Sequence, residues 1–368
     1  MMKMHVNRKL GVVATIALSA GIALTSPAAQ ADVDFKGKKI EIVVPFREGG
    51  GADVYARLYS PYLAKLLPGS PAIVIVNIPG GASIRGTNQF EQKAKPDGLT
   101  MLSISTSTFV SYLFGGKKVK YDMSAWRPIV MSPLGSVFYA AKSTGVTGKD
   151  IIADVKKLQK TNLVFGAKNV IAGELRAMLS YELLGMNVKT VFGMERGPSR
   201  KAMLRGEFNI NYDSMGAYMK NATRLIDKGV AVPLFTLGFM QKGGKVVADP
   251  IMPKLPHVAE IYEKLWGKKP EGVVWQAWKN FLYVGVMTSK GFVLPKGTPD
   301  NILNAYIKTV KDLEKDPTFI KRSRKLLGDY PQSYGEDAAE VIKEGISVTP
   351  EVRAWLKTWV KKNYNYNM

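Results

Sequence analysis

The chain has 368 residues and contains no cysteine. Without a thiol, it has no cysteine nucleophile, no cysteine-ligated zinc site, no iron–sulfur cluster and no disulfide. Its two histidines, His5 and His257, leave almost nothing from which a multi-histidine metal site or a Ser-His relay could be built. We therefore expect no metal site, and most common hydrolase chemistry is disfavoured.

The sequence also lacks the short motifs of nucleotide-dependent enzymes and esterases. There is no G-x-x-x-x-G-K-[ST] loop, since Thr147-Gly148-Lys149 is followed by Asp150, and there is no G-x-G-x-x-G after a strand. The G-x-S-x-G motif of α/β-hydrolases is absent as well. These absences disfavour nucleotide cofactors. We predict no cofactor and, together with the family resemblance described below, a protein that is not an enzyme.

Residues 1–31 have the composition of a signal peptide. Three cations and no acid accompany an apolar stretch at 10–24, and Ala29-Gln30-Ala31 supplies the small-x-small pattern for cleavage before Asp32. The apolar stretch is shorter than the roughly 20 residues that span a bilayer, and there is no cysteine to acylate. We therefore expect an exported, soluble protein located in the periplasm.

Positive charge is in clear excess, with 52 Lys and Arg against 30 Asp and Glu and a formal net charge of +22. Such an excess favours anionic partners at long range, of which nucleic acid is the usual one. An exported protein is a poor partner for nucleic acid, and the cations are scattered in short clusters. We expect no nucleic-acid partner, with the charges either solvating the surface or steering an acidic small molecule.

Short β-branched runs alternate with helical stretches along the rest of the chain. Strands are expected at 40–44, 72–76, 100–104, 163–165, 188–192, 208–212 and 230–237. This alternation predicts an α/β fold of mixed or parallel sheets flanked by helices. The apolar segments 135–141 and 281–287 are interpreted as strands that connect two lobes. Lobe 1 then comprises 32–134 plus 288–368 and lobe 2 comprises 135–287, a clamshell that closes over a ligand.

The loops after the strands form the candidate binding site, because ligands of open parallel sheets lie at the carboxyl ends of the strands. Gly49-Gly50-Gly51 directly precedes a helix, so several backbone N–H groups can point at one spot without β-carbons in the way. Together with the helix dipole, these donors predict a pocket for a carboxylate or phosphate. Gly80-Gly81 occupies the equivalent loop after the next strand, and Ser105-Thr106-Ser107-Thr108 follows the third.

Four charged side chains in these loops have two interpretations each. Asp53 either caps its helix or contacts the ligand, and Arg47 either binds a ligand carboxylate or pairs with Glu48 in solvent. Arg196 and Lys168, in loops of lobe 2, either close on the ligand from the far side or are surface charges. The tryptophans of 266–278 either pack in the core or rim the cleft.

The order of these motifs resembles the periplasmic solute receptors of tripartite tricarboxylate transporters, the Bug family. The first loop, Pro45-Phe46-x-x-Gly49-Gly50-Gly51-x-Asp53-Val54-x-Ala56-Arg57-Leu58, carries most of the resemblance. Asn77-x-Pro79-Gly80, Pro96-Asp97-Gly98-x-Thr100, Tyr121-Asp122, Leu204-Arg205-Gly206-Glu207 and Pro295-x-Gly297-Thr298-Pro299 follow in the family's order. The resemblance implies a type II periplasmic-binding-protein fold that captures an organic acid, often a di- or tricarboxylate or an aromatic acid, and presents it to a membrane permease.

The resemblance also implies which residues ring the ligand, largely through backbone N–H groups and water. They are Phe46, Gly50, Gly51, Asp53, Gly80, Ser83, Ser105 and Thr106 in lobe 1, and Gly166, Ala167, Asn169 and Asp213 in lobe 2. The chain departs from the family at Arg47-Glu48, at Ala52 and at Ala167-Lys168-Asn169, and residues 266–280 look enlarged. These departures suggest a pocket of altered charge.

We expect a monomeric receptor in which loop N–H groups near Gly50 and Gly81 hold one carboxylate, hydroxyls of Ser105 and Thr106 assist, and Arg47 or Arg196 selects a second anionic group. Its partners are then a small-molecule carboxylate and an integral-membrane permease. Two alternatives stay open, the ligand-binding component of a sensor system and a periplasmic enzyme that acts on an organic acid.

Overall fold

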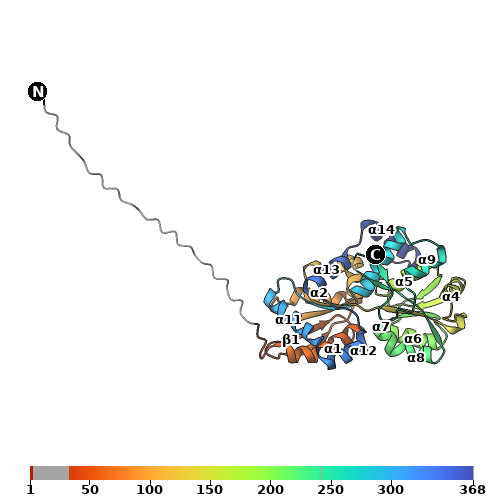
Figure 1. Cartoon of the computed structure of the whole chain (residues 1–368), viewed down its shortest axis with the longest axis horizontal. Helices are drawn as coiled ribbons and strands as arrows, with labels where there is room; N and C mark the ends of the chain where they lie inside the picture. The colour runs from red at the N-terminus through yellow and green to blue at the C-terminus, as the bar shows by residue number, and fades with distance from the viewer. Residues whose placement is uncertain (3–32, 242, 368) are drawn as a thin grey trace. The chain divides into compact units, whose positions relative to one another are not determined.

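The computed structural model describes residues 1–2, 33–241 and 243–367. The chain divides into two units, Met1–Asp32 and Val33–Met368, and every element below belongs to the second unit (Figure 1). The predicted signal peptide and its cleavage site lie almost entirely outside the described residues. Within the described ranges, no helix has both the length and the apolar character of a membrane span.

Six strands form the first sheet, in the order β13-β4-β12-β3-β1-β2. The strands β1 (Lys39–Val44), β2 (Ala72–Asn77) and β3 (Thr100–Ser105) run parallel, as their β-branched runs and intervening helices predict. The late strand β12 (Lys290–Leu294) lies antiparallel between β3 and β4 (Arg127–Ser132), and β13 (Ser333–Tyr334) pairs antiparallel with β4. Lys290, the first residue of β12, therefore pairs with Ser105 at the carboxyl end of β3.

Helices pack on this sheet from distant parts of the chain (Figure 1). The helix α1 (Gly51–Leu66) contacts β2 and β3, whereas α11 (Asp300–Leu313) and α13 (Gly335–Ile346) contact β4. On α1, the rings of Tyr55 and Tyr59 lie 4.7 and 5.3 Å from that of Phe292 on β12, measured between centroids. This aromatic cluster packs the first half of α1 against β12. The remaining helices here are α2 (Ile84–Lys93), α3 (Thr106–Phe114) and α12 (Pro317–Leu327).

A second group of strands follows β4 in the chain. The strand β5 (Ser136–Ala141) lies antiparallel between β8 (Ile210–Ser214) and β9 (Ala231–Thr236), and β6 (Leu163–Gly166) pairs in parallel with β7 (Val188–Val191). The backbone N–H of Asn209 donates to the carbonyl of Val164 at 3.2 Å, which joins the two pairings. The short strands β10 (Phe239–Met240) and β11 (Val246–Val247) form a separate antiparallel pair.

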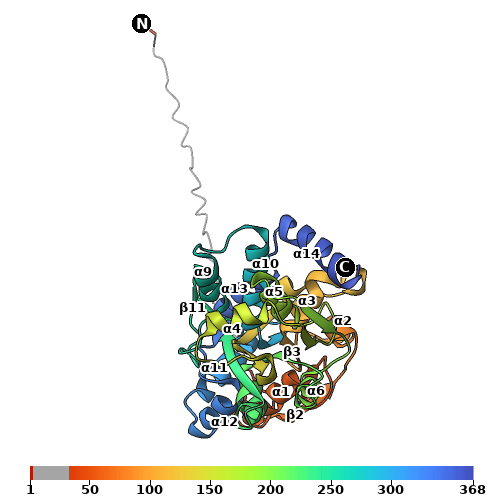
Figure 2. The same cartoon turned by 90° about the vertical axis from the view of Figure 1, so that its right-hand side faces the viewer.

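The helices that accompany the second group are mostly short. They are α4 (Ile151–Leu158), α5 (Leu175–Leu183), α6 (Arg196–Leu204), α7 (Met215–Ala217), α8 (Thr223–Asp227), α9 (Val258–Trp266) and α10 (Gly272–Leu282), with the C-terminal α14 (Pro350–Tyr364) packed on α10 (Figure 2). Short 3-10 helices lie at η1 (Gly81–Ser83), η2 (Gly116–Lys118), η3 (Met123–Ala125) and η4 (Lys142–Thr144). Short π-helices lie at η5 (Tyr218–Ala222) and η6 (Tyr283–Met287).

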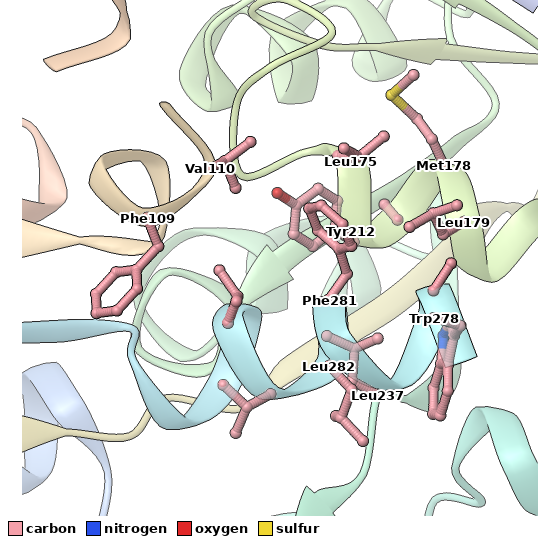
Figure 3. Packing of buried hydrophobic residues seen from close by; sticks show 14 of the residues in the cluster. Phe109, Val110, Leu175, Met178, Leu179, Tyr212, Leu237, Trp278, Phe281 and Leu282 are labelled. Atoms are coloured by element: carbon pink, nitrogen blue, oxygen red, sulfur yellow. The ribbon is translucent and has the colours of Figure 1, made fainter. Parts of the chain in front are cut away.

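The interpretation of residues 281–287 as a connecting strand is wrong, because α10 runs through Leu282 and continues as the π-helix η6. The helix α10 packs between α5 and α14, so Trp278, Phe281 and Leu282 are buried (Figure 3). The run 281–287 is apolar throughout, so periodicity alone cannot distinguish it from a buried strand. The other segment, 135–141, does contain a strand, β5, which lies inside the second group.

The chain passes from the first sheet to the second group at residues 133–135 and returns between η6 and β12. Gly135 lies against a buried pair in which the Tyr330 hydroxyl bonds both carboxylate oxygens of Asp249, at 2.8 and 2.9 Å. A β-carbon on Gly135 would overlap both of these groups. The crossing is therefore closely packed, while the lobe boundaries at 134/135 and 287/288 stay a prediction.

Replacing Gly135 by alanine is expected to lower the free energy of unfolding by about 1–3 kcal/mol, because an added methyl in a filled site forces its neighbours to move. Thermal or urea unfolding measures this loss. Gly197→Ala is the matched control, since the nearest atom to its β-carbon is at 4.0 Å. Equal stability of both variants would contradict the close packing at the crossing.

Candidate functional site

A cavity of about 830 Å³ is lined by both groups of strands. The first sheet contributes the loops after β1, β2 and β3 and the start of β12, and the second group contributes the loop after β6, the starts of α5 and α6, and the end of β8. This volume is typical of a small-molecule site. Seven Lys and Arg residues line it against four Asp and Glu residues, and within the described lining there is no histidine.

Most of the site residues predicted from the sequence meet at this cavity. Eleven of them line it: Phe46, Arg47, Gly50, Gly51, Gly80, Ser83, Ser105, Thr106, Asn169, Arg196 and Asp213. Four do not: Asp53, Gly81, Gly166 and Ala167. Gly81 lies between the lining residues Gly80 and Ala82, whereas Gly166 and Ala167 are buried behind the wall. That the eleven contact a ligand stays a prediction.

The loop before α1 exposes the start of that helix to the cavity. Gly50 is the N-cap residue, and no side chain caps it in the described structure. Gly50, Gly51 and Ala52 all line the cavity, so the first-turn N–H groups lack the side-chain partner that helices usually have there. Unpaired N–H groups at a helix N-terminus attract anions. The local geometry therefore suits a carboxylate, as the glycine run indicates.

Asp53 holds this loop in place and has no free oxygen for a ligand. Its Oδ2 accepts from the Gly49 N–H and from Arg57 Nε, both at 2.9 Å, and its Oδ1 accepts from Asn77 Nδ2 at 3.0 Å. Asn77 also donates to the carbonyl of Phe46 at 3.0 Å. Burial by itself raises the pKa of Asp53, but these bonds outweigh it and hold the pKa below its usual value. Of the two interpretations of Asp53, the structural one fits.

The variant Asp53→Asn is expected to lower the free energy of unfolding by about 1.5–3 kcal/mol at pH 7, as for lost hydrogen bonds to a buried charge. A carboxyl with a lowered native pKa stabilises the fold above pH 3.8, and this stabilisation disappears as the pH falls through the native pKa. The difference between variant and wild type should therefore shrink below about pH 4.

Unfolding curves between pH 3 and pH 7 check this prediction. Glu48→Gln is the control, because the exposed pair of Glu48 with Arg57 should contribute less than about 1 kcal/mol. An Asp53→Asn variant as stable as wild type at pH 7 would contradict the loop-pinning role.

The next two loops present strained backbone and a second helix start. Gly80, Gly81, Ala82 and Ser83 all have positive φ, at 141°, 58°, 55° and 94°, and the Ser111 hydroxyl donates to the Ala82 carbonyl at 2.8 Å. Positive φ in non-glycine residues persists only where the surroundings enforce it, and such strain clusters at binding sites. After β3, residues 105–107 line the cavity at the start of α3.

Arg196 lines the cavity, but most of its donors are used within the wall. Its Nη1 donates to Asn211 Oδ1 at 2.6 Å and to the Tyr212 carbonyl at 3.0 Å, and its Nη2 donates to the carbonyl of Gly166 and to Ser199. Glu174 lies 3.6 Å from its Nε. Arg196 therefore ties β6 to β8, and this geometry does not favour it as the group that selects a second anion.

Two other predicted groups are also paired. Asp213 Oδ1 accepts from Arg200 at 2.6 Å and its Oδ2 from the Tyr139 hydroxyl at 2.8 Å. Burial raises the pKa of Asp213 despite these partners. Arg47 is exposed at the cavity and does not pair with Glu48, which binds Arg57 at 2.9 Å. None of the described tryptophans of 266–278 lines the cavity, and Trp278 is buried beside Trp275.

Lys290 and Arg176 are lining residues that the sequence analysis missed. The Lys290 ammonium donates to the Ser289 carbonyl at 2.8 Å and lies beside Gly51, at the start of α1. Burial, together with the nearby charges of Arg176 and Lys168, lowers the pKa of Lys290 to about 7. Local sequence carries no signal for this, because β12 enters the sheet from 185 positions beyond its partner Ser105. Only the antiparallel insertion of β12 brings Lys290 to the site.

The variant Lys290→Met is expected to raise the melting temperature at pH 6 by about 2 °C or more, because it removes a partly desolvated charge. A lysine with a lowered native pKa destabilises the fold fully below pH 7, and this effect fades as the pH rises to its ordinary value of 10.5. Melting curves from pH 6 to pH 10 measure it. Lys220→Met, at an exposed lysine of the same cavity, is the control. A lower melting temperature for Lys290→Met at pH 6 would contradict this account.

Comparison with known proteins places these features in context. No family model matches the chain. A UPF0065 protein of Bordetella bronchiseptica is 25% identical over 332 residues, which covers 88% of this chain and 87% of that protein. The periplasmic binding protein BugD superposes with a TM-score of 0.60 at 19% identity, covering 87% of this chain and 97% of that one.

Two further solved structures come from Rhodopseudomonas palustris. Rpa4515 with adipate has a TM-score of 0.65 at 19% identity, covering 91% of this chain and 99% of that one. MatC with bound malate has a TM-score of 0.59 at 19% identity, covering 86% and 98%. The chain is similar to the UPF0065 protein in sequence and to BugD, Rpa4515 and MatC in fold. These findings confirm the two-lobed periplasmic-binding-protein fold and the family resemblance predicted from the motifs.

Proposed function

We propose that the chain is an exported solute-binding receptor that captures an organic carboxylate between two lobes and delivers it to a tripartite tricarboxylate-type membrane permease. The observation that carries this proposal is the uncapped start of α1, which opens with Arg47 onto one cavity. A carboxylate satisfies both the helix N–H groups and the Arg47 guanidinium. Three of the lining acids, Asp213, Glu48 and Glu174, lie beside arginines of the protein itself.

The ligand class follows from the cavity together with the relatives. Rpa4515 was solved with adipate and MatC with malate, and both ligands are aliphatic dicarboxylates. We infer a ligand of the same class, held through one carboxylate by N–H groups around Gly50 and Gly80. Arg47, exposed beside these groups, is the better placed of the two predicted arginines to contact it.

The proposed movement is closure about the two crossings at residues 133–135 and 288–289. With lobes at 32–134 plus 288–368 and at 135–287, the cavity lies between them. A ligand shifts a hinge only through contacts that the closed state strengthens. The cations on both walls supply such contacts when an anion bridges them.

The proposed location is the periplasm, with the leader cleaved before Asp32. Binding a small molecule and a permease requires no catalytic side chain. The described lining of the cavity contains no histidine. Among the described residues, no group of three or more metal-binding side chains of the His, Asp and Glu type lies together. A receptor for a sensor system has the same binding chemistry, and the identity of the membrane partner separates it from uptake.

The test is a thermal-shift and calorimetric screen of carboxylic acids against the chain from Asp32 onward. The expected result is one ligand per chain, no product, and no binding of the corresponding amide. A ligand at 100 times its Kd should stabilise the fold by about 2.7 kcal/mol.

Arg47→Ala should weaken the best acid about tenfold, the loss of roughly 1.4 kcal/mol. Arg205→Ala, which removes an exposed arginine paired with Glu207, is the control and should leave affinity unchanged. Turnover of the acid, or equal binding of the neutral amide, would contradict the proposed function.

A further inference from the structure

Three cations from opposite walls of the cavity lie near one another. Lys290 belongs to β12 of the first sheet, whereas Arg176 lies on α5 and Lys168 on the loop between β6 and α5. The charges of Arg176 and Lys168 both act on Lys290. Among the described residues, none of the three forms an ion pair. We call these three residues the cationic cluster.

Arg176 has a donor left unused inside the protein. Its side chain is 7% exposed, its Nη1 donates to the Gly285 carbonyl, and its guanidinium lies 5.2 Å from the centre of the Tyr212 ring. Its Nε is buried and, in the described structure, has no hydrogen-bond partner. A buried guanidinium nitrogen without a partner is unfavourable by itself. An acceptor delivered by a ligand would satisfy it.

Lys290 is surrounded by positive potential. Its ammonium lies beside Gly51 at the start of α1, where the helix dipole is positive, and it faces Arg176 and Lys168. Its one described hydrogen bond goes to the neighbouring Ser289 carbonyl. Burial, followed by the charges of Arg176 and Lys168, lowers the pKa of Lys290, which agrees with this arrangement.

The acids of the cavity do not neutralise the cationic cluster. Asp213 is bound by Arg200 and Tyr139, and Glu48 is bound by Arg57. Glu174 lies 3.6 Å from Arg196 Nε. The fourth lining acid, Glu195, is exposed at the start of α6 and forms no ion pair with the cationic cluster in the described structure. The positive charge around Lys290 therefore exceeds what a single carboxylate at the start of α1 would balance.

We propose that Lys290, Arg176 and Lys168 form a second subsite, which binds one carboxylate of an organic dianion whose other carboxylate is held by the helix and loop N–H groups. This inference rests on the proposed function and specifies its ligand. The two subsites adjoin at Gly51, so the two carboxylates lie a few bonds apart, as in short aliphatic diacids. Without the anion, the cations of the two walls repel each other, and the bound carboxylate removes this repulsion and favours closure.

The experiment compares diacids with monoacids of the same chain length. Isothermal titration at pH 6 and low salt uses succinate with butanoate and adipate with hexanoate on the chain from Asp32 onward. Wild type should bind at least one diacid ten times or more tightly than its monoacid. Lys290→Met and Lys168→Met should each weaken the diacid about tenfold and leave the monoacid unchanged. Lys228→Met, at an exposed lysine outside the cavity, is the control, and Lys290→Arg should retain most of the diacid affinity.

Proton uptake gives a second readout that a purely structural lysine would not produce. At pH 8, heats measured in two buffers of different ionisation enthalpy should show that wild type takes up a proton when the diacid binds, because the anion recharges Lys290. The charged groups that face Lys290 are Arg176 on α5 and Lys168 on the preceding loop. The variant Lys168→Met shows whether Lys168 contributes to the proton uptake. Lys290→Met should show no uptake.

The outcomes separate the two proposals. If monoacids bind as tightly as diacids and Lys290→Met changes neither affinity, the second subsite is overturned while the receptor function stands. If the folded protein binds no acid of either kind, both proposals are overturned. Loss of monoacid and diacid affinity together in Lys290→Met would also overturn the second subsite, because the lysine would then support the whole pocket.

Discussion

Uncompensated positive charge inside a cavity is the constraint on which the architecture of the site depends. A helix start without a side-chain cap, a partly buried lysine and a buried arginine with an unused donor all face the same space. Each would be more stable with an acceptor or an anion beside it. Natural proteins keep such unfavourable groups where a ligand satisfies them, and the free protein is then less stable than its core alone would permit.

The fold brings these groups together through its topology. Parallel strands deliver the loops after β1, β2 and β3 to one edge of the sheet, and Asp53 fixes the first of these loops through three hydrogen bonds. The antiparallel strand β12 then returns from the second group and sets Lys290 beside Ser105. The second group presents Arg176 and Lys168 from across the cavity. An anion held by both walls links binding to closure, the step on which the proposed receptor function relies.

Local sequence patterns predicted the parts of this arrangement that local chemistry decides. The glycine loops, the helix starts and the parallel strands of the first sheet follow from glycine spacing, β-branched runs and turn residues, and the structure confirms them. Residues 281–287 were misassigned because this run, at the end of α10 and in η6, is apolar throughout and packs among other helices. Lys290 and Arg176 were missed because their position depends on long-range strand insertion and on packing around Gly285, neither of which leaves a local pattern. Arg196 was predicted as a ligand-binding residue from its position in a loop. Only the tertiary structure shows that its N–H groups are bonded to residues of the cavity wall.

The measurement that tests this account most directly is a crystal structure of the chain from Asp32 onward, grown with the tightest-binding acid of the screen. The account predicts a carboxylate within about 3 Å of a first-turn N–H of α1, with an acid group at hydrogen-bond distance of the Lys290 ammonium. A ligand that leaves the start of α1 and Lys290 unoccupied, or one seated outside the cavity, would contradict it.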